Sequence, residues 1–89
     1  MSYEIFRTKS FRKSFKKIDQ TAQEEVLRVV ALLADKKPLP ASMRDHLLSG
    51  AFRDCRECHI RPDLLLIYRF RDEILELALI DVGTHSDLF

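Results

Sequence analysis

The sequence predicts an α+β fold: a two-helix hairpin packed on one face of a small, mainly antiparallel sheet of four strands. Three observations predict this fold. Apolar residues recur at helical spacing over residues 11–34, three short apolar runs follow from residue 54 onward, and a further run of strand character lies at residues 3–7. The element order is therefore β-α-α-β-β-β, and the sheet face away from the helices is left for function.

The first strand, residues 3–7, is indicated by its aromatic and β-branched residues. Either Thr8 or Ser10 can cap the helix that follows. The apolar positions of this helix recur at i, i+4 and i+7 and therefore share one face: Phe11, Phe15 and Ile18.

The second helix is predicted to begin at Thr21, because Thr21 and Glu24 match a capping box, in which two side chains satisfy orphan amide groups. A wide apolar stripe follows: Ala22, Val26, Val29, Val30 and Leu33. The helix is expected to end at Ala34 or Asp35, since Pro38 and the proline that follows it cannot continue a helix.

The rest of the chain is predicted to be a loop followed by a three-stranded meander. Residues 36–53 are loop-like, with room for one turn of helix at residues 41–44. The strands are expected at residues 54–60, 64–70 and 74–82, and short polar turns separate them. The middle strand is apolar on both faces, which is typical of a central strand.

The totals favour one small domain, residues 1–89. Only two glycines and three prolines interrupt the chain, and hydrophobic residues make up 46% of it, as in ordinary globular proteins. No apolar run approaches the roughly 20 residues of a membrane span. The N-terminus has no basic segment followed by a long apolar one. We therefore expect no membrane association and a cytoplasmic location.

Charge is unevenly distributed, although the net charge is only +1. Residues 7–17 hold six Lys or Arg and no acid, whereas residues 72–89 hold five acids and no Lys or Arg. Within the basic run, Lys13, Lys16 and Lys17 are candidates for contacting phosphates or an acidic partner. A solvated helix face explains the same lysines equally well.

Cys55 and Cys58 have the C-x-x-C spacing of a redox pair or of half a zinc site. If their segment is a strand, residues three apart point to opposite faces and cannot chelate one ion together. No second cysteine pair is present to complete a set of four ligands. We expect two reduced cysteines, at least one of them in the core, and neither a metal ion nor a cofactor.

The three histidines all fall in the polar joints between apolar segments, and each has a carboxylate within four positions. Histidine is the side chain that, with its ordinary pKa, gains or loses a proton between about pH 5 and 8, so it is suited to proton transfer. In the expected strand, Glu57 and His59 share one face. Strand pairing can bring Asp63 and His85 towards His59, although sequence does not fix the register. His46 lies upstream, in the predicted loop.

Three segments carry a family resemblance. Residues 56–68 read RECHIRPDLLLIY, residues 45–50 read DHLLSG, and residues 83–89 read GTHSDLF. In this order and spacing, the segments resemble the motifs of the YafQ-like toxins, which belong to the RelE/ParE superfamily of bacterial toxin–antitoxin systems. The resemblance spans nearly the whole chain and implies the same β-α-α-β-β-β fold.

The resemblance implies an endoribonuclease that cleaves mRNA, usually on the translating ribosome, and that needs no metal. In this family the ribose 2′-OH attacks the adjacent phosphate and leaves a 2′,3′-cyclic phosphate or a 3′-phosphate. A cognate antitoxin protein wraps and silences the toxin, and operator DNA is reached only through that antitoxin. The family's active-site positions fall on five residues: His46, His59, Asp63, His85 and Phe89. Arg56 and Glu57 match a basic and an acidic position of the central motif.

These residue types suit that chemistry. Two histidines of opposite protonation state can take the 2′-OH proton and protonate the leaving 5′-oxygen, and His85 is our candidate for the acid. Asp63 can orient a histidine, and Arg56 or a histidinium can offset the developing phosphate charge. Phe89 can stack on an unpaired base, or it can act as a hydrophobic clamp. Glu57 can belong to the site or pair with a neighbouring arginine.

Two positions depart from the family pattern. Asp81 stands where family members often carry Arg, which removes a phosphate contact and raises the question of weaker catalysis. Leu64 replaces a common Trp, which we interpret as a packing change.

Two functions other than RNA cleavage stay open. The chain can be a catalytically silent member that acts through its antitoxin and operator, or a gyrase-directed relative. The three-histidine set favours RNA cleavage over the gyrase-directed alternative, and a metal module of His46, His59 and Cys58 conflicts with strand alternation.

Overall fold

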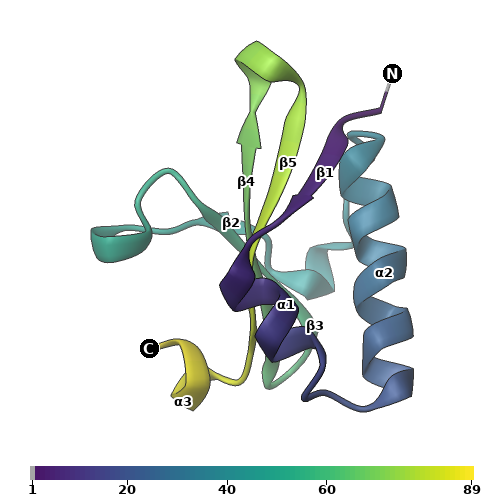
Figure 1. Cartoon of the computed structure of the whole chain (residues 1–89), viewed down its shortest axis with the longest axis vertical. Helices are drawn as coiled ribbons and strands as arrows, with labels where there is room; N and C mark the ends of the chain where they lie inside the picture. Colours follow the sequence, from purple (N-terminus) through teal and green to yellow (C-terminus); the bar gives the residue numbers. More distant parts are fainter. Residues whose placement is uncertain (1) are drawn as a thin grey trace.

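The computed structural model, which describes residues 2–89, is built around a five-stranded sheet in the order β1-β5-β4-β3-β2 (Figure 1). The strands are β1 (Glu4–Arg7), β2 (His46–Leu47), β3 (Arg56–Arg61), β4 (Leu64–Arg71) and β5 (Glu76–Gly83). The helices are α1 (Lys9–Phe15), α2 (Gln20–Ala34) and α3 (His85–Leu88). β1 pairs in parallel with β5, and the other pairs are antiparallel. The predicted α+β class is confirmed, and the predicted elements follow one another as expected, with β2 and α3 added to them.

The sheet has one strand more than predicted. β2 contains only two residues, lies in the segment predicted to be loop, and pairs antiparallel with β3. Two residues carry no periodic apolar pattern, so their pairing leaves no signal in the sequence. The register places His46 opposite Glu57. The short helix α3 was likewise not predicted.

Both helices of the hairpin begin at a capping side chain. Thr8, one of the two predicted caps of α1, accepts a hydrogen bond from the Phe11 amide at 3.1 Å. Asp19 caps α2 and accepts a hydrogen bond from the Ala22 amide at 2.8 Å. The predicted cap at Thr21 is therefore wrong, because Asp19 precedes it and aspartate is the stronger N-cap residue.

The core lies between the helix hairpin and one face of the sheet. Its fully buried side chains come from both layers: Phe11, Val26, Val30, Cys58, Leu66, Tyr68, Leu77 and Val82. Figure 1 shows α2 on one side of the sheet and the loop that follows β2 on the other. Across the described residues, no helix is both long and apolar enough to cross a lipid bilayer.

Strand alternation in β3 separates this core from the opposite sheet face. Cys58 packs in the core, and its neighbours Glu57 and His59 therefore point to the other face. Cys55 and Cys58 are both buried and unbridged, as predicted. Within residues 2–89, no three His, Cys, Asp or Glu side chains lie close enough to hold a metal ion together.

Candidate functional site

Glu57 is the buried centre of the candidate site. The residue is only 4% exposed, and its Oε1 lies 3.7 Å from His46 Nε2 and 3.6 Å from His59 Nε2. His46 reaches Glu57 from the paired position on β2, and His59 reaches it from two residues further along β3. A buried carboxylate is costly unless neighbouring groups compensate its charge, and here two imidazoles flank it.

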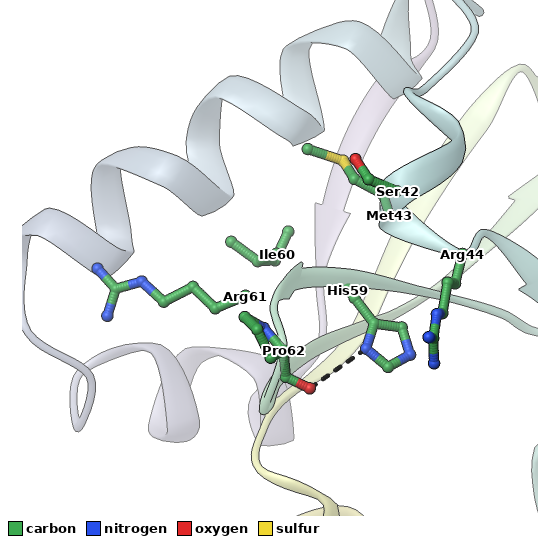
Figure 2. Close-up of a pocket in the computed structure, with 7 residues that line it drawn as sticks. All are labelled: Ser42, Met43, Arg44, His59, Ile60, Arg61 and Pro62. Carbon is green, nitrogen blue, oxygen red and sulfur yellow. Dashed lines mark hydrogen bonds between the residues drawn. The ribbon is translucent and has the colours of Figure 1, made fainter.

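The other ring nitrogen of each of these histidines lies beside a backbone carbonyl. His46 Nδ1 is 2.7 Å from the Arg44 oxygen, and His59 Nδ1 is 3.4 Å from the Pro62 oxygen (Figure 2). A carbonyl oxygen only accepts hydrogen bonds, so Nδ1 is the donor in both rings. Nε2 of each ring lies on the side of the Glu57 carboxylate, whose charge favours a proton on that nitrogen.

His85 joins this group from the start of α3. Its Nδ1 and its backbone nitrogen each lie 3.3 Å from Oδ1 of Asp63, which follows β3 in the chain. The centroid of its ring lies 6.0 Å from that of His59. A capping box of Thr84 and Asp87 holds α3, and the hydrogen bond from the Thr84 amide lowers the pKa of Asp87. The structure therefore brings Asp63 and His85 to His59.

Phe89 lies next to His85 and remains 62% exposed. Its ring centroid is 6.3 Å from that of His85 and 5.7 Å from that of Phe52, which it meets edge to face. Phe52 belongs to a 3₁₀ turn, Gly50–Phe52, in the loop after β2. Phe52 was not predicted from the sequence. The one signal that could have found it is its position, as an aromatic residue just after the upstream motif at residues 45–50.

Arg56 is not brought to the histidines. It pairs in register with Tyr68, on the core face of the sheet, and its Nε donates to Asp45 Oδ1 at 3.2 Å. The Tyr68 hydroxyl donates to the same Asp45 oxygen, and burial together with this bond raises the pKa of Tyr68. This position does not support the phosphate contact expected of Arg56. Sequence reasoning did not single out Asp45, which ties the segment that carries His46 to the core.

The predicted basic surface is only partly near the site. Lys13, Lys16 and Lys17 are all exposed, at and just after the end of α1. Lys17 lines a hollow that it shares with Thr84, the residue before His85. Of the three lysines, Lys17 is therefore the one that approaches α3.

Asp81 is held by α1. Its Oδ1 accepts hydrogen bonds from the Ser14 hydroxyl at 2.6 Å and from the Val82 amide at 2.8 Å. Asp81, the acid that replaces the family's common arginine, therefore has hydrogen-bond donors from within the protein. Leu64, the second departure, packs in the core cluster and is 8% exposed, in keeping with a packing change.

Fold and site together define a class. A helix hairpin on a mainly antiparallel sheet, with three histidines and a buried glutamate gathered near the sheet face away from the helices, is the arrangement that the toxin motifs of the sequence predict. The family model described as "Bacterial toxin of type II toxin-antitoxin system, YafQ" matches residues 3–89. The chain belongs to this YafQ family of bacterial toxins, as its motifs predict.

Two curated relatives show the same likeness. The chain is 40% identical over 58 residues to the mRNA interferase toxin YafQ of Escherichia coli, covering 65% of this chain and 61% of the relative. It is 37% identical over 62 residues to a putative toxin YafQ of Haemophilus influenzae, covering 67% and 61%. The matched segments thus span 61% of the length of either relative.

Solved structures match over almost the whole chain. A metal-bound toxin from Helicobacter pylori superposes with a TM-score of 0.87 at 37% identity, covering 98% of this chain and 99% of that one. The E. coli DinJ–YafQ toxin–antitoxin complex matches with a TM-score of 0.84 at 29% identity, covering 100% and 99%. Both likenesses support the fold described above.

Proposed function

We propose that this chain is an endoribonuclease toxin that cleaves mRNA on the translating ribosome without a metal ion. The observation that carries the proposal is the convergence of three histidines. His46 and His59 flank the Glu57 carboxylate at 3.7 and 3.6 Å, and the ring of His85 lies 6.0 Å from that of His59. Paired histidines can supply the base and the acid that RNA cleavage needs. The E. coli relative is an mRNA interferase, which supports the same reaction.

In the proposed reaction His59 is the base and His85 is the acid. Nε2 of His59 takes the proton of the ribose 2′-OH, and the 2′-oxygen attacks the adjacent phosphorus. The bond from phosphorus to the 5′-oxygen breaks, and His85 donates a proton to that oxygen. The products are a 2′,3′-cyclic phosphate and a free 5′-OH. Each proton transfer contributes about 10²–10⁴-fold in rate.

The carboxylates position the histidines in this proposal. Asp63 lies 3.3 Å from His85 Nδ1 and orients the ring, so that Nε2 faces the leaving group. Glu57 compensates the charge that His59 gains when it takes a proton. His46, whose side chain is 50% exposed beside the same carboxylate, offsets the developing phosphate charge as an imidazolium.

Binding in this proposal uses the exposed groups around the histidines. Phe89 stacks on a base next to the cleaved phosphate, a contact that contributes about 1–3 kcal/mol in other nucleic-acid binders. Lys13, Lys16 and Lys17 contact ribosomal RNA or an acidic segment of the antitoxin. An antitoxin partner is supported by the E. coli relative, which was solved in complex with the DinJ antitoxin. Operator DNA is contacted only through that partner.

Expression in bacteria without an antitoxin tests the proposal. We expect wild-type protein to arrest growth and to deplete intact mRNA, and we expect His59→Ala and His85→Ala to relieve both effects at equal protein levels. Growth arrest that persists in both variants with mRNA intact would overturn the assigned site and favour a gyrase-directed toxin. No arrest by wild-type protein would favour the catalytically silent alternative.

A further inference from the structure

A cavity of about 400 Å³ begins at His59 and extends over residues that the proposed reaction does not use. Met43, Ile60 and Pro62 give it an apolar lining, and Arg44 and His59 stand at its polar side (Figure 2). An apolar pocket with a few fixed polar groups is the usual form of a small-ligand site. We propose that this cavity is a second nucleotide subsite, in which the apolar lining receives a base and Arg44 binds the phosphate beside it. The proposal rests on the proposed function.

Arg44 is the arginine whose charge is available here. Arg56 is engaged with Asp45, and Arg61 also lines the cavity but turns its guanidinium away, towards Glu25 of α2 at hydrogen-bonding distance. Arg44 takes part in none of the ion pairs among residues 2–89. Figure 2 shows its side chain running along the same side of the cavity as the ring of His59, and both residues line the cavity. A guanidinium without an ion-pair partner and an imidazole on one side of a cavity suit a phosphate.

The backbone of Arg44 gives a second, independent reason. Its φ is +49°, in the left-handed region that glycine or asparagine adopts more readily than arginine. Arg44 follows the 3₁₀ turn Ala41–Met43, and its carbonyl oxygen lies 2.7 Å from His46 Nδ1. The carbonyl thereby reaches His46, while the side chain lines the cavity that His59 also lines. Lys36, Asp54 and Leu75 have a similar φ away from the cavity, so these two placements of Arg44, and not the strain alone, support the subsite.

The subsite also fits the order of rings across the site. Phe89, His85 and His59 follow one another with centroid separations of 6.3 and 6.0 Å, and the cavity begins at His59. A phosphate between His85 and His59 therefore has Phe89 on one side and the cavity on the other. Phe89 receives the base on the first side and the cavity receives the base on the second.

The left-handed backbone of Arg44 allows its charge to be removed without strain on the fold. Arg44→Asn removes the guanidinium but retains a residue that tolerates this conformation, so the fold is expected to be at least as stable as wild type. Arg44→Gly is a second variant of the same kind. Arg61→Gln is the matched control, because it removes the same charge from the other arginine of the cavity, whose side chain points elsewhere.

Binding of a 2′-O-methylated RNA tetranucleotide, followed by fluorescence anisotropy, tests the proposal, since this probe lacks the attacking 2′-OH and cannot be cleaved. We expect Arg44→Asn and Arg44→Gly to weaken binding about tenfold or more, as for other lost charged hydrogen bonds. The dependence of log K on log salt should become shallower by about 0.7. Arg61→Gln should bind within about twofold of wild type, because the Arg61 guanidinium is already paired with Glu25 and points away from the cavity.

The outcomes separate this proposal from the function on which it rests. Unchanged binding by both Arg44 variants overturns the subsite, even if His85→Ala abolishes cleavage and the proposed function stands. Equal losses in Arg61→Gln and Arg44→Asn also overturn it, because they indicate a diffuse charge effect. Failure of wild-type protein to bind the probe overturns the subsite, and the mRNA cleavage assay then decides the function independently.

Discussion

The Asp45 carboxylate accepts a hydrogen bond from the buried hydroxyl of Tyr68, on the face of the sheet opposite the histidines. The next residue, His46, begins the two-residue strand β2, which is too short to hold its own position. Arg56 donates to the same Asp45 oxygen at 3.2 Å. This network therefore fixes the strand that carries His46 and sets its distance to Glu57.

Asp45→Ala should destabilise the protein and impair cleavage together. The Tyr68 hydroxyl would be left buried without an acceptor, which costs about 1–3 kcal/mol of the free energy of unfolding. Tyr68→Phe should cost less, because Asp45 keeps its bond to Arg56. Urea denaturation and mRNA cleavage measure the two effects. Asp54→Asn, in the loop before β3, serves as the control, because asparagine tolerates the left-handed backbone of that position. An Asp45→Ala variant indistinguishable from that control would contradict the positioning role.

Glu57→Gln should slow cleavage while leaving the fold intact. Glutamine keeps the shape of the side chain but removes the charge between His46 and His59. We expect the rate of mRNA cleavage to fall by about 10²-fold, the lower end of what a proton-transfer group contributes, because the charge that His59 gains is no longer compensated. Glu73→Gln, at the exposed turn before β5, is the matched control. Equal rates in the two variants would remove Glu57 from the site.

Phe89→Leu separates base stacking from a hydrophobic clamp. If Phe89 stacks on a base, cleavage at limiting RNA concentration should fall about tenfold, whereas the thermal stability should change little. Phe52→Leu alters the other partner of the same aromatic contact, which has a centroid distance of 5.7 Å. A clamp predicts that the two substitutions act alike, and this outcome would rule out the stacking role.

Cys58 should remain an unreactive thiol in the folded protein. Burial raises the pKa of Cys58 to about 12, whereas an unfolded cysteine ionises near about 8.5. The folded state therefore binds the proton more tightly, and its stability should fall as pH rises above about 8.5, by up to about 1.4 kcal/mol per pH unit from this group. Chemical denaturation between about pH 8 and 10 measures the slope. Cys58→Val should flatten it, and rapid alkylation of Cys58 in the native protein would contradict this account.

The helix hairpin and the meander could be predicted because their apolar periodicity repeats over many residues. The convergence of His59, Asp63 and His85 followed from the order of the strands, although their distances depend on a register and a bulge that no local pattern encodes. Arg56 shows the limit most clearly. Its neighbour in sequence belongs to the site, yet strand alternation places Arg56 itself on the core face with Asp45.

The site residues contributed by loops were harder to predict for a different reason. Arg44 and Phe52 lie in 3₁₀-turn regions whose conformation is set by contacts with distant elements. Asp81 could be recognised as a departure from the family pattern, but only the structure shows that Ser14 on α1 binds its carboxylate. Short irregular segments carry little periodic signal, so their partners become visible only in three dimensions.

The central claim is that histidines drive cleavage through the ribose 2′-OH, and the chemistry of the product ends tests it most directly. Purified protein should be added to translating ribosomes in the presence of EDTA, with His85→Ala as the inactive comparison. The account predicts mRNA fragments that end in a 2′,3′-cyclic phosphate or a 3′-phosphate, with 5′-OH on the downstream piece, and none with His85→Ala. Fragments with 3′-OH and 5′-phosphate ends, or cleavage abolished by EDTA, would contradict it.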